Sequence, residues 1–142
     1  MPEPSLMALI VIIVLALGFG IVNGFNDAAN AIATVVGTRT LTPHKAVMLA
    51  AVFNMLGAAT GSAVAITIGK GILTPEAISY QTVIAALVSV IIWTATATFY
   101  GLPVSLTHGF IAALVAAGVA ASGPSAVNWD IIATVASAVG TA

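Results

Sequence analysis

Residues 46 to 68 form a stretch of 23 residues without one charged side chain. A bilayer core about 30 Å thick is crossed by about 20 apolar helical residues, so this stretch alone is long enough to span a membrane. Of the 142 residues, 61% are hydrophobic and 5% are charged, whereas soluble domains carry roughly 25% charged residues. The apolar residues occur in unbroken runs rather than in alternation, which disfavours a β-barrel. The sequence therefore predicts an all-α, polytopic (multi-pass) protein of the lipid bilayer.

Several other classes are excluded. The net charge of -1 leaves no basic surface for nucleic acid, and the absence of cysteine excludes disulfides and thiolate metal sites. The sequence contains no nucleotide-binding, metalloprotease or Ser/His/Asp motif. We therefore expect neither an enzyme nor a cofactor.

The order of apolar segments predicts a single transmembrane unit over residues 1–142, with four or five hydrophobic segments. The first segment contains Gly18, Gly20 and Gly24, so it either runs long or breaks there, and we expect a broken helix. The predicted segments are a first helix over 6–36, a second over 46–68, a re-entrant helical hairpin over 77–121 with its tip at 101–108, and a truncated last segment over 131–142.

The hairpin prediction rests on the sequence GLPVSLTH at 101–108, which interrupts a helix with Gly and Pro. The apolar run that follows, residues 109–121, is short for a span. Irregular backbone at membrane depth is tolerated where protein or a watery cavity surrounds it. The alternative is an ordinary span over 102–122 with Pro103 in its first turn.

Orientation depends on few charges. Arg39 and Lys45 lie in one loop and Lys70 in the next, on the opposite side. Because cytoplasmic loops carry an excess of basic residues, we expect residues 37–45 in the cytoplasm and the N-terminus outside, in the plasma or inner membrane.

Five polar residues share one face of the first predicted helix, at positions i, i+3, i+4, i+7 and i+11. An Asp at the centre of a membrane helix costs about 2.5 to 3.5 kcal/mol on insertion scales and usually faces a bundle interior or a watery path. The alternative is a structural role, although an interhelical polar contact contributes only about 0.6 kcal/mol on average. This polar stripe consists of Asn23, Asn26, Asp27, Asn30 and Thr34.

Carboxylate and amide oxygens are hard ligands, which suit a small alkali cation or a proton better than a soft metal. We therefore predict a coupling-ion site for Na⁺ or H⁺ at Asp27. The other members of the polar stripe would surround the ion.

The predicted tip offers the complementary chemistry. Ser105 and Thr107 stand where the helix containing Gly109 would begin, and a helix N-terminus is a ready site for an anion. Broken helices that converge at the midplane are a device of transporters. Ser105 could instead be a simple N-cap, which is worth about 1 kcal/mol. His108 could relay protons, donate to an anion or be structural.

Three stretches resemble the inorganic phosphate transporter (PiT) family. They are NGFNDAANAIATVVGTRTLT at 23–42, AAVFNMLGAATG at 50–61 and GLPVSLTHGFIAALVAAGVA at 101–120. The first resembles the family signature of Gly, any residue, Asn or His, Asp, a short gap, Ala-Asn-Ala and Thr. The third resembles the family's Gly-Leu-Pro-Val-Ser-Thr-Thr-His tip. The resemblance covers most of the chain.

The resemblance implies a symporter that moves inorganic phosphate with Na⁺ or H⁺ by alternating access and contains two inverted repeats. It implies that Asn26, Asp27 and Asn30 belong to the ion and phosphate site. It further implies that Ser105 and Thr107 contact phosphate at the tip, where His108 adjoins them.

Two features depart from the family pattern. Leu106 stands where the family usually has a second hydroxyl, and each motif is present once. The chain thus resembles one N-terminal-type repeat, which is half a site. It could be a fragment, a half-size protein that pairs with an inverted second copy, or one with a separate partner chain; a homodimer is the working hypothesis. There are two functional alternatives. The chain could transport another oxyanion such as sulfate, or it could be a non-transporting assembly subunit or an inactive half-repeat.

Overall fold

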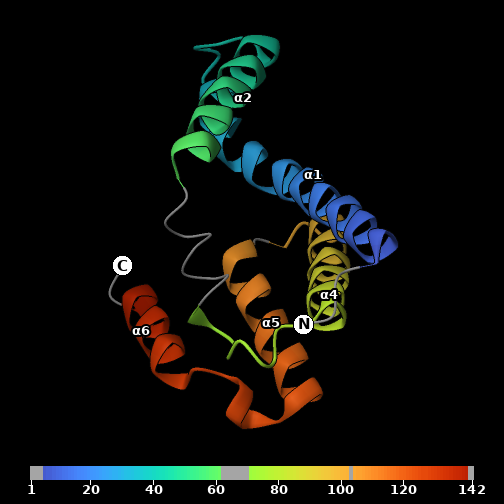
Figure 1. Ribbon diagram of the computed structural model, residues 1–142. Coiled ribbons are helices and arrows are strands. Elements are labelled where there is room, and N and C mark those ends of the chain that lie inside the picture. Colours follow the sequence, from blue (N-terminus) through green and yellow to red (C-terminus); the bar gives the residue numbers. More distant parts are fainter. Residues whose placement is uncertain (1–4, 62–70, 103, 141–142) are drawn as a thin grey trace.

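The computed structural model describes residues 5–61, 71–102 and 104–140. These ranges contain no strand, apart from an isolated bridge between Leu73 and Val127. Two helices, α1 and α4, are long and apolar enough to cross a membrane. The all-helical part of the predicted fold class is therefore confirmed. The elements are α1 (Leu6–Gly37), α2 (Pro43–Thr60), α4 (Tyr80–Phe99), α5 (Leu106–Ser122), the 3-10 turn η1 (Pro124–Ala126) and α6 (Trp129–Gly140) (Figure 1).

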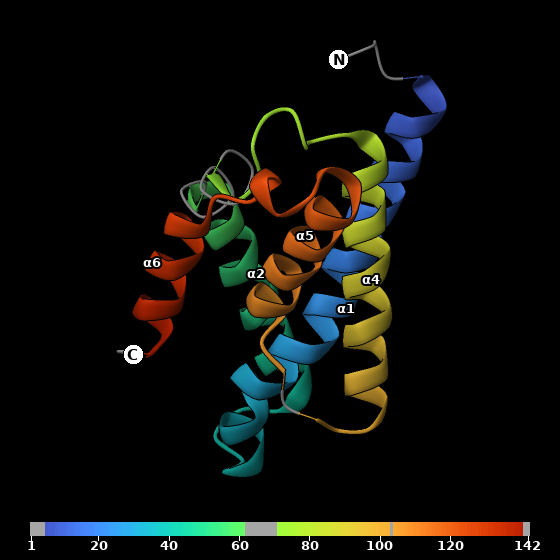
Figure 2. The ribbon, with the colours of Figure 1, turned by 90° about the horizontal axis from the view of Figure 1, so that it is seen from below.

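Helix α4 packs against both α1 and α5, and α2 folds back along the second half of α1 (Figure 2). Helices α1 and α4 run in the same direction, because Gly18 lies beside Ile91 and Asn26 beside Thr98. Helix α5 returns in the opposite direction, and its Phe110 stacks on Phe19 of α1 with 5.5 Å between ring centroids. Most large apolar side chains of α1 and α2 are exposed on this chain, as expected for surfaces that face lipid or another protein segment.

The predicted break in the first helix is wrong. Helix α1 is continuous over 32 residues, through Gly18, Gly20 and Gly24. At about 1.5 Å per residue, it is about 48 Å long and exceeds the thickness of the hydrocarbon core. A glycine costs about 1 kcal/mol relative to alanine inside a helix. A broken helix in lipid would leave several backbone groups unpaired, which costs more.

Serine side chains cap the starts of three helices. The hydroxyl oxygens of Ser5, Ser79 and Ser105 accept hydrogen bonds from the amides of Ala8, Thr82 and His108. Ser79 therefore starts α4 at Tyr80, not at residue 77 as predicted.

Helix α2 begins at Pro43, earlier than the predicted 46, because proline at the first helical position has its φ preset and no amide to satisfy. Residues 62–68 of the predicted second helix, and Lys70, lie outside the described residues.

Helices α4 and α5 form a helical hairpin, as predicted. The turn after α4 contains Gly101 at φ +66, and the amide of Leu102 donates to the carbonyl of Ala97 at 2.9 Å. Helix α5 begins at Leu106, whereas the alternative of an ordinary span began at residue 102. Whether this hairpin is re-entrant stays a prediction.

The packed core lies at the opposite end of the bundle from this turn (Figure 2). The segment that precedes α4 contributes Ile72 and Leu73, which are 1% and 5% exposed. The amides of Thr74 and Asn128 donate to the carbonyls of Ala126 and Ile72, both at 2.9 Å. These bonds hold the segment against η1 and the residue that precedes α6. The anchored end leaves the turn between α4 and α5 as the less buried end of the bundle.

Candidate functional site

The polar stripe of α1 is joined to α4 by one side-chain hydrogen bond. The amide nitrogen Nδ2 of Asn26 donates to Oγ1 of Thr98 at 3.3 Å. Asn26 is 9% exposed and is the one buried residue of α1 among those described. This bond places the centre of the stripe beside the last turn of α4.

The remainder of the stripe faces outward. Asp27, Asn30 and Thr34 are exposed, and Asn23 is half-buried. Among the residues that the structure describes, the side chains of Asp27 and Asn30 have no hydrogen-bond partner. An unpaired carboxylate next to unpaired amides on an apolar helix is a set of oxygen ligands available to a bound ion or to a second protein segment.

The tip carries hydroxyls directly before and within the first turn of α5. Ser105 is the N-cap of α5, with its oxygen 3.5 Å from the amide nitrogen of His108. Ser105 thus caps α5, and its contact with phosphate stays a prediction. Thr107 and His108 are exposed. The amides of Leu106 and Thr107 have no partner within the helix itself, as at any helix start. Both hydroxyls and amides thus lie at one helix end.

Leu106 points into the bundle. It is 5% exposed and belongs to the buried apolar residues. A hydroxyl at this position would have to be buried in the same way, which would cost free energy unless it were paired. The departure from the family pattern at Leu106 therefore serves packing.

The hydrogen bond of Asn26 connects the stripe to the base of the tip. The carbonyl of Thr98 accepts from the amide of Gly101 at 3.1 Å, so the turn starts at the residue that Asn26 contacts. Within the described ranges, no hydrogen bond links the stripe directly to Ser105, Thr107 or His108. The structure thus brings the two predicted groups to one end of the bundle and leaves them unconnected.

Two threonines of α4 that lie on one helix face next to the polar stripe were not predicted from the sequence. Thr98 anchors Asn26, and Thr94 lies one turn earlier on the same face of α4, fully buried. The hydroxyl of Thr94 has no hydrogen-bond partner among the described residues. A sequence pattern could have indicated both residues: the apolar sequence WTATATF at 93–99 has threonines at i and i+4, which share one helix face.

The charge of the site is small. No three His, Asp or Glu side chains come together in the described part of the chain. Asp27 is the one carboxyl group of the stripe, and the other four members are three amides and a hydroxyl. Hard neutral ligands around one carboxylate match a monovalent cation better than a multivalent metal ion.

The fold and the site together indicate the class of membrane protein to which the chain belongs. Helix α1, which is apolar and long enough to cross a bilayer, carries a carboxylate and amides on one face, and the capped start of α5 lies at the same end of the bundle. Intramembrane polar groups of this kind mark the ion and substrate pathways of membrane transport proteins.

Comparisons with known proteins identify the family. Residues 23–142 match the family described as PHO4, the phosphate transporter family. A Bacillus subtilis (strain 168) protein named "Probable low-affinity inorganic phosphate transporter" is 44% identical over 126 residues, which are 87% of this chain and 38% of that protein. A Streptomyces halstedii protein with the same name is 45% identical over 131 residues, 91% of this chain and 61% of that protein. The chain belongs to the phosphate transporter family.

A solved structure has the same fold. The structure titled "The sodium-dependent phosphate transporter" superimposes with a TM-score of 0.87 at 33% identity, over 92% of this chain and 34% of that one. The chain thus spans about a third of that transporter and less than two thirds of either relative.

Proposed function

We propose that this chain provides one half of a membrane transporter that moves inorganic phosphate together with Na⁺. The observation that carries the proposal is the structural match to a protein titled as a sodium-dependent phosphate transporter over nearly the whole chain. The names of the two relatives support phosphate as the substrate. H⁺ is the alternative coupling ion. Such a protein acts by transport and needs no cofactor, and it would not be an enzyme.

In this proposal Asp27 holds the coupling ion. Asn23, Asn30 and Thr34 contribute neutral oxygens from the same helix face, and the exposed side chains of Asn30 and Thr34 are open to the ion in this chain. Asn26 is already oriented by Thr98. Since Nδ2 of Asn26 donates to Thr98, its carbonyl oxygen Oδ1 remains available to a cation.

Phosphate would bind at the start of α5. The hydroxyls of Ser105 and Thr107, the first amides of the helix and the ring of His108 can donate hydrogen bonds to an oxyanion. Asn26 and Asn30 would reach it from α1. Neutral donors hold phosphate without a buried lysine or arginine, so the anion can also be released.

The other half of the site would come from a second, inverted repeat. The chain covers about a third of the solved transporter, so that repeat would be supplied by a second copy, a separate chain or further sequence of a longer protein. Alternating access would then move the two repeats against each other around a midplane site. We place the unit in the plasma or inner membrane, with residues 37–45 in the cytoplasm and the N-terminus outside.

Uptake of labelled phosphate into liposomes tests this proposal. The purified chain is reconstituted alone and together with the remaining portion of the Bacillus subtilis relative, with and without an inward Na⁺ gradient. We expect gradient-dependent uptake in at least one arrangement, and uptake by the chain alone would favour an inverted homodimer.

Two other outcomes of this experiment would contradict phosphate transport. If labelled sulfate is taken up in preference to phosphate, the substrate is sulfate. A folded chain that supports no uptake in either arrangement would contradict transport and would favour an assembly subunit or an inactive half-repeat.

A further inference from the structure

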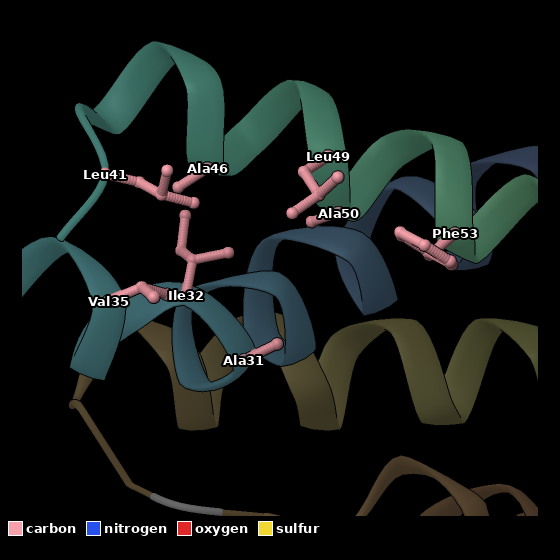
Figure 3. A pocket seen from close by; sticks show the side chains of 8 residues that line it. All are labelled: Ala31, Ile32, Val35, Leu41, Ala46, Leu49, Ala50 and Phe53. Carbon is pink, nitrogen blue, oxygen red and sulfur yellow. The ribbon is translucent and has the colours of Figure 1, made fainter.

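An apolar cavity of about 200 Å³ lies between α1 and α2 (Figure 3). All eight residues that line it are apolar, including Ile32 and Val35 of α1 and Leu49 and Phe53 of α2. It contains no polar side chain that could hold water or an ion. Its chemistry fits a hydrocarbon chain.

The cavity follows the α1–α2 hairpin inward from its connecting loop. Leu41 and Ala46 line one end, beside the loop, and Phe53 lines the other (Figure 3). From Ala46 to Phe53 the cavity extends about 10 Å along the helix axis at 1.5 Å per residue. A lipid chain that entered beside the loop would therefore keep its headgroup at the level of residues 38–45.

Basic residues adjoin in sequence the residues that line that end of the cavity. Arg39 lies two residues before Leu41, and His44 and Lys45 directly precede Ala46. All three are exposed, and no acidic side chain pairs with any of them in the part of the chain that the structure describes. The loop thus presents unneutralised positive charge where a headgroup would lie.

The position of Lys45 is unfavourable for the helix itself. The first turn of α2 contains no acidic residue, and a lysine near a helix N-terminus opposes the positive end of the helix dipole. A bound anion would relieve this repulsion. Basic pockets between membrane helices on the cytoplasmic side bind anionic lipid headgroups in the same way.

We propose that the α1–α2 cavity binds an anionic phospholipid, with an acyl chain against Ile32, Leu49 and Phe53 and its phosphate beside Arg39 and Lys45. The occupant is a membrane lipid; free phosphate is not the ligand of this site, because the cavity is apolar. The site is separate from Asp27 and from the tip, and it depends only on the membrane location of the chain.

Native mass spectrometry of the full 142-residue chain tests the proposal. The chain is purified in neutral detergent and titrated with phosphatidylglycerol or phosphatidylcholine of identical acyl chains. We expect about 25-fold tighter retention of phosphatidylglycerol, because each of two basic side chains near a headgroup contributes about fivefold. Millimolar inorganic phosphate should not displace the lipid. Equal retention of the two lipids, or displacement by phosphate, would overturn the proposal.

Two kinds of variant test the headgroup and the acyl chain of the lipid separately. Lys45→Gln should lower the preference for phosphatidylglycerol about fivefold, and Lys45→Arg should keep it. Ala50→Phe places a ring in the cavity and should weaken both lipids, whereas Ala51→Phe is the matched control, since Ala51 does not line the cavity. Helicity by circular dichroism verifies folding. An unchanged preference in Lys45→Gln, or equal effects of the two phenylalanines, would contradict the site and leave the basic loop as a topology signal.

Discussion

Asn26 and Thr98 are separated by 72 positions in the sequence, and their side chains meet at 3.3 Å. Through this hydrogen bond the signature motif of α1 is fixed to the last turn of α4, directly before the tip. The contact couples the proposed ion ligands to the hairpin that carries the proposed phosphate ligands.

The Asn26–Thr98 bond should be measurable as a coupling energy. In a double-mutant cycle of Asn26→Ala and Thr98→Val, we expect a coupling of about 0.5 to 1.5 kcal/mol, in the range of hydrogen bonds in membrane proteins. Unfolding in detergent followed by circular dichroism measures it. Thr96→Val is the matched control on the same helix, since the side chain of Thr96 is also exposed but makes no hydrogen bond among the described residues. Additive effects of Asn26→Ala and Thr98→Val would refute the bond.

Thr94→Val should stabilise the chain. The hydroxyl of Thr94 is fully buried without a partner among the described residues, and an unsatisfied buried polar group costs about 1 to 3 kcal/mol. Valine has nearly the same shape, so we expect the melting temperature to rise and Na⁺-dependent uptake to persist. A fall in stability would show that the hydroxyl is paired in the membrane, and selective loss of uptake would assign it to the pathway.

Gly118→Ala should destabilise the packed end of the bundle. A Cβ at residue 118 would overlap Cδ2 of Leu73, which is buried in the core, and overpacking costs about 1 to 3 kcal/mol. Gly20→Ala is the control, because a Cβ at residue 20 would meet no atom of another element within 4 Å and alanine is the better helix former. Thermal melting compares the two. A destabilising Gly20→Ala would argue against the continuous α1, and a neutral Gly118→Ala against the packing at Leu73.

Substitutions in the tip should separate capping from phosphate binding. Ser105→Asp preserves an N-cap but adds a negative charge, so we expect unchanged stability and loss of phosphate uptake. Ser105→Ala should lose about 1 kcal/mol of stability as well. Thr107→Val should lower uptake without affecting stability, since Thr107 is exposed and makes no side-chain hydrogen bond among the described residues. Uptake at the unsubstituted level in both Ser105→Asp and Thr107→Val would exclude the tip as the phosphate site.

Part of the fold could be predicted from the sequence because apolar length and helix breakers are local signals. The extent of α1, the α4–α5 hairpin and the Ser105 cap follow from such signals. The continuity of α1 could not be predicted, since the small cost of glycine in a helix has to be weighed against backbone pairing in lipid.

The hydrogen-bond partner of Asn26 could not be predicted from the sequence either. Thr98 is one of several threonines in α4, and only the packing of α1 on α4 selects it. The burial of Leu106 likewise depends on the direction in which α5 leaves the turn. The roles of Asp27, Asn30 and Thr107 in binding stay predictions, because their exposed side chains make no contact in this chain that would assign them.

The role of Asp27 is the central claim, and Na⁺-dependent phosphate uptake by Asp27→Asn tests it most directly. The matched control is Asp130→Asn, which removes an exposed carboxylate on α6. Loss of a charged ligand is worth about 1.5 to 3 kcal/mol, so we predict at least a tenfold fall in the Na⁺-dependent component for Asp27→Asn. We predict no change for Asp130→Asn and normal helicity for both. Uptake by Asp27→Asn that keeps its full dependence on Na⁺ would contradict the account.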